Sequence, residues 1–143
     1  MATVRTYNAA DVTISVDGQL ITGVARDTFV KVEHDEVAFT KKVSADGITS
    51  RAKSNNYTGK ITFTLNQTSD GNLILDAIHE RDESFTDGVV EIKITDNSGL
   101  SNHIAAEGWP EKQPAAEFGA EEKEREWVFD CGLISMMEGG NVV

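Results

Sequence analysis

The alternation of apolar and polar residues is sharpest over residues 57–66 and changes to a helical spacing soon afterwards. Three apolar residues alternate there with three polar ones, which predicts a strand with one buried and one hydroxyl-rich face (Ile61, Phe63, Leu65; Thr62, Thr64, Asn66). Residues 67–72 interrupt the alternation, and Ser69 or Asp70 can cap a helix start. The apolar residues that follow predict an amphipathic helix with a single stripe (Leu73, Ile74, Ala77, Ile78). Because no other such helix is evident, we expect it to cover a sheet.

Short strands separated by turns predict that sheet. Asp17-Gly18 is a favoured two-residue turn, and pairing outward from it sets Ile14 opposite Ile21 and Thr13 opposite Thr22. Further strands are expected at 28–32, 37–43, 90–95, 101–109 and 126–133, with a break from Pro110 to Pro114. We therefore expect roughly eight to ten strands and one helix in a mainly β sandwich or barrel. No repeat or linker divides residues 1–143, and residues 136–143 are predicted to form a mobile tail.

The segment from residue 40 to residue 60 differs in charge from the rest of the chain. It holds five basic residues against one acid, a net charge of +4 inside a chain of −11, which leaves −15 elsewhere (Lys41, Lys42, Arg51, Lys53, Lys60; Asp46). Few large apolar residues lie in it, and Asp46-Gly47 can turn a hairpin. We expect an extended hairpin that projects from the body. Composition leaves two interpretations open, a solvated loop or an arm that docks on an acidic neighbouring subunit.

The acidic composition limits the kinds of function that the protein can have. Thirteen basic and 24 acidic residues argue against nucleic-acid binding, because phosphates must be met by Lys and Arg. No apolar run approaches the roughly 20 residues of a membrane span, and the N-terminus has no apolar signal region. The single cysteine, Cys131, excludes an internal disulfide, and synthesis in a reducing cytosol is expected.

Candidate chemistry is sparse. His34, His79 and His103 lie far apart without partners at ligand spacing, so neither a metal nor another cofactor is predicted. Cys131 has aromatic neighbours and is interpreted as a buried, inert thiol. We expect no enzyme. A β-sandwich binding module, with Trp109 or Trp127 as a carbohydrate platform, is the alternative from another class, and a barrel enzyme using histidine and acids is the least favoured.

Several segments in a fixed order carry a family resemblance. They are Gly23-Val24-Ala25, the strand-to-helix segment ITFTLNQTSDGNLILDAI, the D-N-S-G turn, AAEGWPEKQPAAEFGAEEKEREWVF, and a terminal Gly-Gly. Over nearly the whole chain this pattern resembles the tail tube proteins of contractile-tailed, myovirus-type bacteriophages. The tubes of secretion systems and bacteriocins are related in fold and remain a neighbouring possibility.

The resemblance implies a structural virion protein made in the bacterial host cytoplasm. It implies hexameric rings that stack into a hollow tube inside the tail sheath, with baseplate and tail terminator proteins as further partners. Genomic DNA would pass through the lumen without specific binding, because an acidic wall repels phosphate. The segment 40–60 corresponds in position to the extended hairpin used between rings. Four residues are therefore the candidates for inter-subunit contacts (Lys41, Lys42, Arg51, Lys53).

Overall fold

The computed structural model describes residues 4–140, and these residues form ten strands, one α-helix and a short 3-10 helix. After the 3-10 helix at Ala9–Asp11, the elements are β1 (Val12–Val16), β2 (Gln19–Leu20), β3 (Val30–His34), β4 (Phe39–Val43), β5 (Thr49–Lys53), β6 (Gly59–Asn66), α1 (Gly71–Phe85), β7 (Val90–Asp96), β8 (Asn102–Lys112), β9 (Glu124–Cys131) and β10 (Ile134–Met137). The expected mainly β fold with one helix is confirmed.

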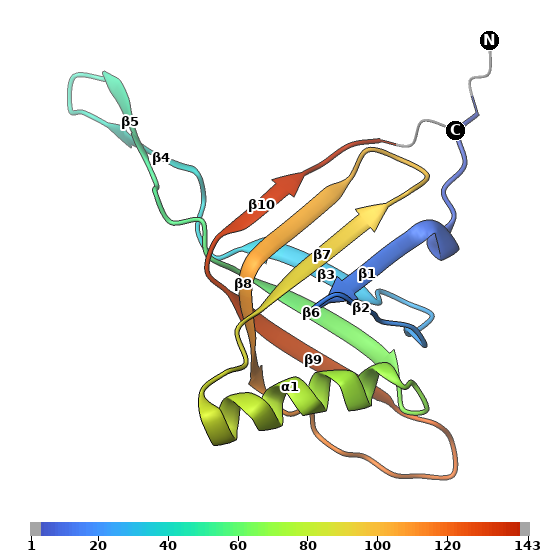
Figure 1. Cartoon of the computed structure of the whole chain (residues 1–143). Coiled ribbons are helices and arrows are strands. Elements are labelled where there is room, and N and C mark those ends of the chain that lie inside the picture. The colour runs from blue at the N-terminus through green and yellow to red at the C-terminus, as the bar shows by residue number, and fades with distance from the viewer. Residues whose placement is uncertain (1–3, 141–143) are drawn as a thin grey trace.

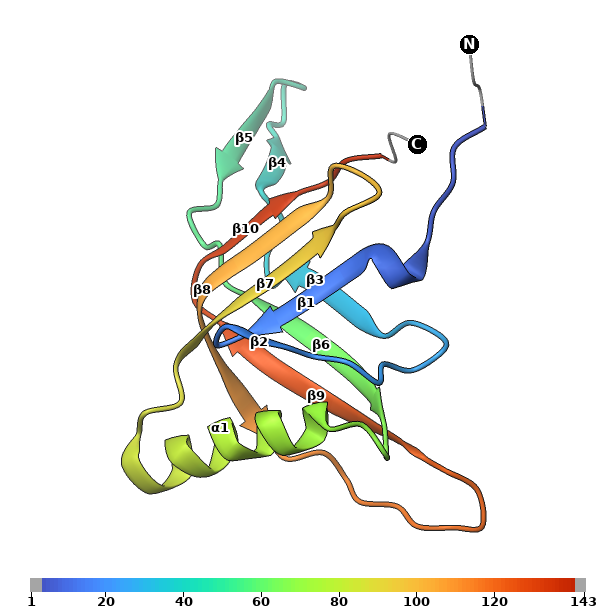
Figure 2. The same cartoon turned by 45° about the vertical axis from the view of Figure 1, so that its right-hand side comes forward.

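Eight strands form one antiparallel sheet in the order β2-β1-β7-β8-β9-β6-β3, with β10 paired to β8. The long strand β8 belongs to both halves of this sheet. Its first residues, 102–105, pair with β7 and β10, whereas Gly108–Lys112 pairs with β9 across a register shift. The sheet therefore turns at β8 and folds over, so that β1 and β7 lie across from β3, β6 and β9 (Figures 1 and 2).

The core fills the space between the two halves of the sheet. Ile61, Phe63 and Leu65 of β6 are fully buried, as the alternation predicted, and the Phe63 and Phe129 rings meet edge to face with centroids 5.6 Å apart. Trp127, Phe129 and Cys131 of β9 point into the same core. The helix α1 closes one end of it (Figure 1), because its buried Leu75 and Ile78 complete the apolar cluster.

The first hairpin and the second large strand follow their predicted patterns. Asp17 and Gly18 both adopt positive φ, of 53° and 77°, as their two-residue turn requires, and the Ile21 amide donates to the Ile14 carbonyl at 2.9 Å. Strand β2 is only two residues long, however, and the predicted Thr13–Thr22 pair lies outside the ladder. The main partner of β1 is β7, whose apolar residues are buried as expected.

Three expectations were wrong in detail. The helix buries Leu75 and Ile78, whereas Leu73 of the predicted stripe is 74% exposed, because the face that packs on the core is centred on Leu75 and Ile78 with Ile74 beside them. Strand β8 continues through Pro110, which lies beside the register shift, where a missing amide donor is tolerated. The tail predicted from residue 136 starts as strand β10, and Gly140 accepts a hydrogen bond from the Leu100 amide at 3.1 Å. The last part of that tail, residues 141–143, lies outside the described residues.

Candidate assembly interface

The two-stranded β4–β5 hairpin stands away from the body (Figure 1), and every residue of its strands is exposed. It contains all four candidate contact residues. Lys41 is paired with Arg51, Lys42 with Ser50, and Lys53 with Phe39. The Arg51 guanidinium lies over the Phe39 ring, 4.2 Å from its centroid. The sequence-predicted cations are thus brought together on one projecting element, together with an aromatic ring that the sequence analysis did not select.

Polar contacts join the two legs of the hairpin at its base. The Ser54 amide donates to the Ala38 carbonyl at 2.8 Å, and the Ser54 hydroxyl donates to the Glu36 carboxylate at 2.9 Å. The Thr58 hydroxyl lies 2.9 Å from the Asp35 carboxylate, to which it can donate. At the tip, Gly47 takes a φ of +87°, which favours glycine. These contacts define where the hairpin starts and turns.

Strand β3 leaves an open sheet edge. It ends the strand order and pairs only with β6 within residues 4–140. The Thr64 amide donates to the Phe29 carbonyl, and the Asp35 amide donates to the Thr58 carbonyl, both at 2.9 Å. Because hydrogen-bonding direction alternates along a strand, the backbone groups of Val30, Val32 and His34 point away from β6. This edge can accept a further strand.

The outward face of the half-sheet formed by β3, β6, β9 and the end of β8 is polar. Strand pairing and the contact of Lys60 with Glu111 put three cations, five carboxylates, two hydroxyls and an amide on it, together with Trp109 and Val128 (Lys31, Lys60, Lys112, Glu33, Glu111, Glu124, Glu126, Asp130, Thr62, Thr64, Asn66). The Lys60 ammonium lies 3.3 Å from Glu111 and 3.8 Å from Asp130. Its hydrogen bond to Glu111 raises the pKa of Lys60, and burial, followed by the charge of Glu111, raises the pKa of Asp130. The charged and polar side chains of this face are therefore compatible with contact with water.

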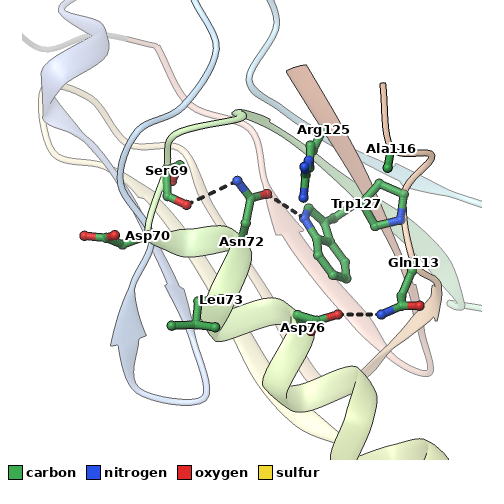
Figure 3. A pocket seen from close by; sticks show the side chains of 10 residues that line it. Ser69, Asp70, Asn72, Leu73, Asp76, Gln113, Ala116, Arg125 and Trp127 are labelled. Atoms are coloured by element: carbon green, nitrogen blue, oxygen red, sulfur yellow. Dashed lines mark hydrogen bonds between the residues drawn. The ribbon is translucent and has the colours of Figure 1, made fainter. Parts of the chain in front are cut away.

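The end of the molecule opposite the hairpin is acidic. It is formed by α1, whose sequence carries four acids against Arg81, and by residues 113–126, with five acids against Lys123 and Arg125. An open groove of about 500 Å³ lies between the two segments. In Figure 3 the Trp127 indole donates to the Asn72 side chain, at 3.0 Å, and Gln113 donates to Asp76 at 2.6 Å. These bonds link the loop and β9 to the helix.

The other candidate residues do not converge on a chemical site. Among residues 4–140, no group of three metal-ligating side chains occurs, and no helix is long and apolar enough to cross a membrane. Burial raises the pKa of the Cys131 thiol to about 12, which agrees with an inert thiol. Trp127 is buried and hydrogen-bonded, so it is not available as a carbohydrate platform.

Comparison with known proteins decides between the interpretations. The family model described as the bacteriophage PhiTE tail tube protein matches residues 4–139. The chain is also 32% identical over 144 residues to structural protein ORF10 of Pseudomonas phage KPP10, with 95% of this chain and 83% of that protein covered.

The chain belongs to the PhiTE tail tube protein family. It is therefore a structural protein of a phage tail and part of the virion, as the resemblance implied. The carbohydrate-binding alternative has no support from these relatives.

Solved structures agree with this tube protein in fold. The cap of the anti-feeding prophage matches with a TM-score of 0.64 at 10% identity, covering 96% of this chain and 94% of that one. A chain of the sheath–tube complex of the PVC extracellular contractile injection system gives 0.62 at 12% identity, covering 92% and 91%. A chain of its sheath/tube terminator gives 0.58 at 11% identity, covering 96% and 100%. At these identities the likeness concerns the fold alone.

Sequence reasoning missed two features of the tube protein's surface. The open edge of β3 follows from pairing between distant strands, which no local pattern specifies. Phe39 could have been selected from the sequence, because it is a single aromatic residue at the start of a polar, basic hairpin. Its contact with Arg51 could not, because that contact depends on the register of β4 with β5.

Proposed function

We propose that the protein assembles into hexameric rings that stack into the hollow inner tube of a contractile tail. The observation that carries this proposal is the open edge of β3 beside an uncovered polar half-sheet. An exposed edge invites pairing with another chain, and a closed ring of identical copies removes every such edge. The role is structural rather than catalytic.

The polar half-sheet supplies a suitable wall for the lumen. Its eight charged residues carry a net charge of −2, from three cations and five acids, and the whole chain carries −11 (Lys31, Lys60, Lys112; Glu33, Glu111, Glu124, Glu126, Asp130). Phosphates are repelled by such a surface, so DNA moves through without adhering. The sheath surrounds the tube, and the terminator and baseplate proteins bind its two ends.

The β3 edge gives the proposal a direct test. A proline at Val32 removes an amide that points away from β6, so it blocks pairing with a neighbour without removing a hydrogen bond to β6. The Val32→Ala variant controls for the partly buried side chain. Analytical ultracentrifugation should show ring-sized particles for wild type and Val32→Ala, and monomers for a folded Val32→Pro.

Two results would count against the ring. One is a Val32→Pro protein that assembles as well as Val32→Ala. The other is a wild-type protein that remains monomeric at the highest concentrations reached. Circular dichroism of each variant confirms that a lost ring is not a lost fold.

A further inference from the structure

The two faces of the β4–β5 hairpin differ in chemistry. Directly paired residues share a face, and faces alternate along each strand. One face therefore carries an aromatic ring, a valine and three cations (Phe39, Lys41, Val43, Thr49, Arg51, Lys53). The opposite face carries hydroxyls, one methyl group and one cation (Thr40, Lys42, Ser50, Ala52). We name these the cationic face and the hydroxyl face.

The cationic face has the composition of a binding surface. Phe39 is 46% exposed and Val43 is 60% exposed, although neither is needed for the core. The Arg51 guanidinium is held over the Phe39 ring at 4.2 Å, which fixes a flexible cation before any partner arrives. Aromatic rings and arginine are the residues most enriched at the centres of protein interfaces. By contrast, Glu36 lies with Thr40 and Ala52 of the hydroxyl face at a shallow hollow at the foot of the hairpin, which Lys53 also lines, and its carboxylate opposes a cationic function there.

A second copy of this chain offers the matching surface. The hairpin projects at one end of the molecule, and α1 and the loop before β9 lie at the other end in both views (Figures 1 and 2). The segment Gly71–Phe85 carries a net charge of −3, from four acids and one base, and residues 113–126 carry −3, from five acids and two bases. Head-to-tail stacking of identical copies brings unlike ends together, so the basic hairpin meets this acidic end.

We propose that the cationic face, and not the hydroxyl face, docks on the acidic end of a copy in the next ring. The receiving segments are α1 and residues 113–126. This inference rests on the proposed stacking of rings and names the face that performs it. Of the four candidate cations, Lys41, Arg51 and Lys53 then make the contact between rings, and Lys42 does not.

Two neighbouring lysines provide a matched pair for the test. Lys41→Glu and Lys42→Glu make the same charge change at adjacent exposed residues of one strand, and they differ in the face that is altered. For purified protein without sheath, the concentration at which half the protein pellets as tubes is measured. We expect Lys41→Glu to raise it about tenfold or more, the equivalent of one lost charge contact, and Lys42→Glu to change it less than about twofold. Phe39→Ala should resemble Lys41→Glu.

Equal effects of the two lysine variants, or a larger effect of Lys42→Glu, would overturn the choice of face. If wild type forms no stacked rings, the proposed function itself fails. Lys41→Glu rings that form but do not stack support both statements, because Lys41 lies on the projecting hairpin and outside strand β3.

The receiving surface is mapped separately by photo-crosslinking within tubes in which a small share of labelled chains is mixed with wild-type protein. A benzophenone amino acid at position 41 should crosslink to peptides from 71–85 or 113–126 of another copy, and the same group at position 42 should do so much less. Crosslinks from position 41 to other segments would refute the acidic end as the receiving surface. Because the tubes contain this chain alone, sheath cannot account for the result.

Discussion

The Trp127–Asn72 hydrogen bond is expected to stabilise the acidic end of the molecule, since it joins β9 to α1. The indole Nε1 donates to the Asn72 Oδ1 over 3.0 Å, and the two residues are only 2% and 9% exposed. Trp127→Phe leaves that buried oxygen without its donor, which costs about 1–3 kcal/mol. The smaller ring also leaves unfilled space, so the total loss is about 2–4 kcal/mol of unfolding free energy.

Urea unfolding followed by circular dichroism measures this loss. The protein concentration must lie below that of ring assembly, since association adds to apparent stability. Trp109→Phe is the control, because Trp109 is only partly buried. It should cost less than about 1 kcal/mol.

A double-mutant cycle with Asn72→Ala isolates the bond from the other contacts of Asn72, which also donates to the Asn66 carbonyl at 2.9 Å. We expect the two substitutions to be coupled by about 1 kcal/mol. A coupling near zero, or a Trp127→Phe protein as stable as Trp109→Phe, would refute the reasoning.

Three further predictions concern stability and titration. A Cβ on Gly59 would clash with the Glu33 carbonyl oxygen, so Gly59→Ala should cost about 2–4 kcal/mol in urea unfolding. Gly119→Ala should be nearly neutral, because a Cβ there would make only an ordinary contact with the Lys123 side chain at 3.4 Å, and equal costs would contradict this. The Cys131 thiol, with a pKa of about 12, should react with a disulfide reagent at pH 8 only as fast as the protein unfolds, and immediate labelling would show that it is accessible. Hydrogen bonds from the Thr68 hydroxyl and amide lower the pKa of Glu122 below 4.5, so this contact persists at neutral pH and is lost as the pH falls through the lowered pKa. The Thr68 amide resonance should titrate below pH 4.5 and not titrate in Glu122→Gln, and a midpoint above 4.5 would be inconsistent.

Local patterns predicted the strands better than the orientation of the helix. In β6 and β9 a period of two leaves only one possible buried face, and the burial of Phe63 and Phe129 follows from it. Around α1, residues 73–78 are rich in apolar side chains, so more than one face fits a period of 3.6. The contacts that hold the start of the helix on the body are with other elements: Ser69 donates to the Thr22 carbonyl, and Asn72 accepts from the Trp127 indole at 3.0 Å. These partners are distant in sequence, so local periodicity could not select Leu75 over Leu73.

Only those parts of the candidate interface that depend on local sequence could be predicted. Charge counting located the basic hairpin, and Asp46-Gly47 located its turn, because both are local properties. The faces of the hairpin require the register of two strands, and Lys41 and Lys42 cannot be separated without it. The open edge of β3 requires the order of the whole sheet.

Cryo-electron microscopy of the purified chain, assembled without other tail proteins, tests the central claim most directly. We predict stacked six-membered rings around an open lumen, with β3 of each copy hydrogen-bonded to a strand of its neighbour. Assemblies in which the β3 edge remains unpaired, or fields of single molecules at every concentration, would contradict it.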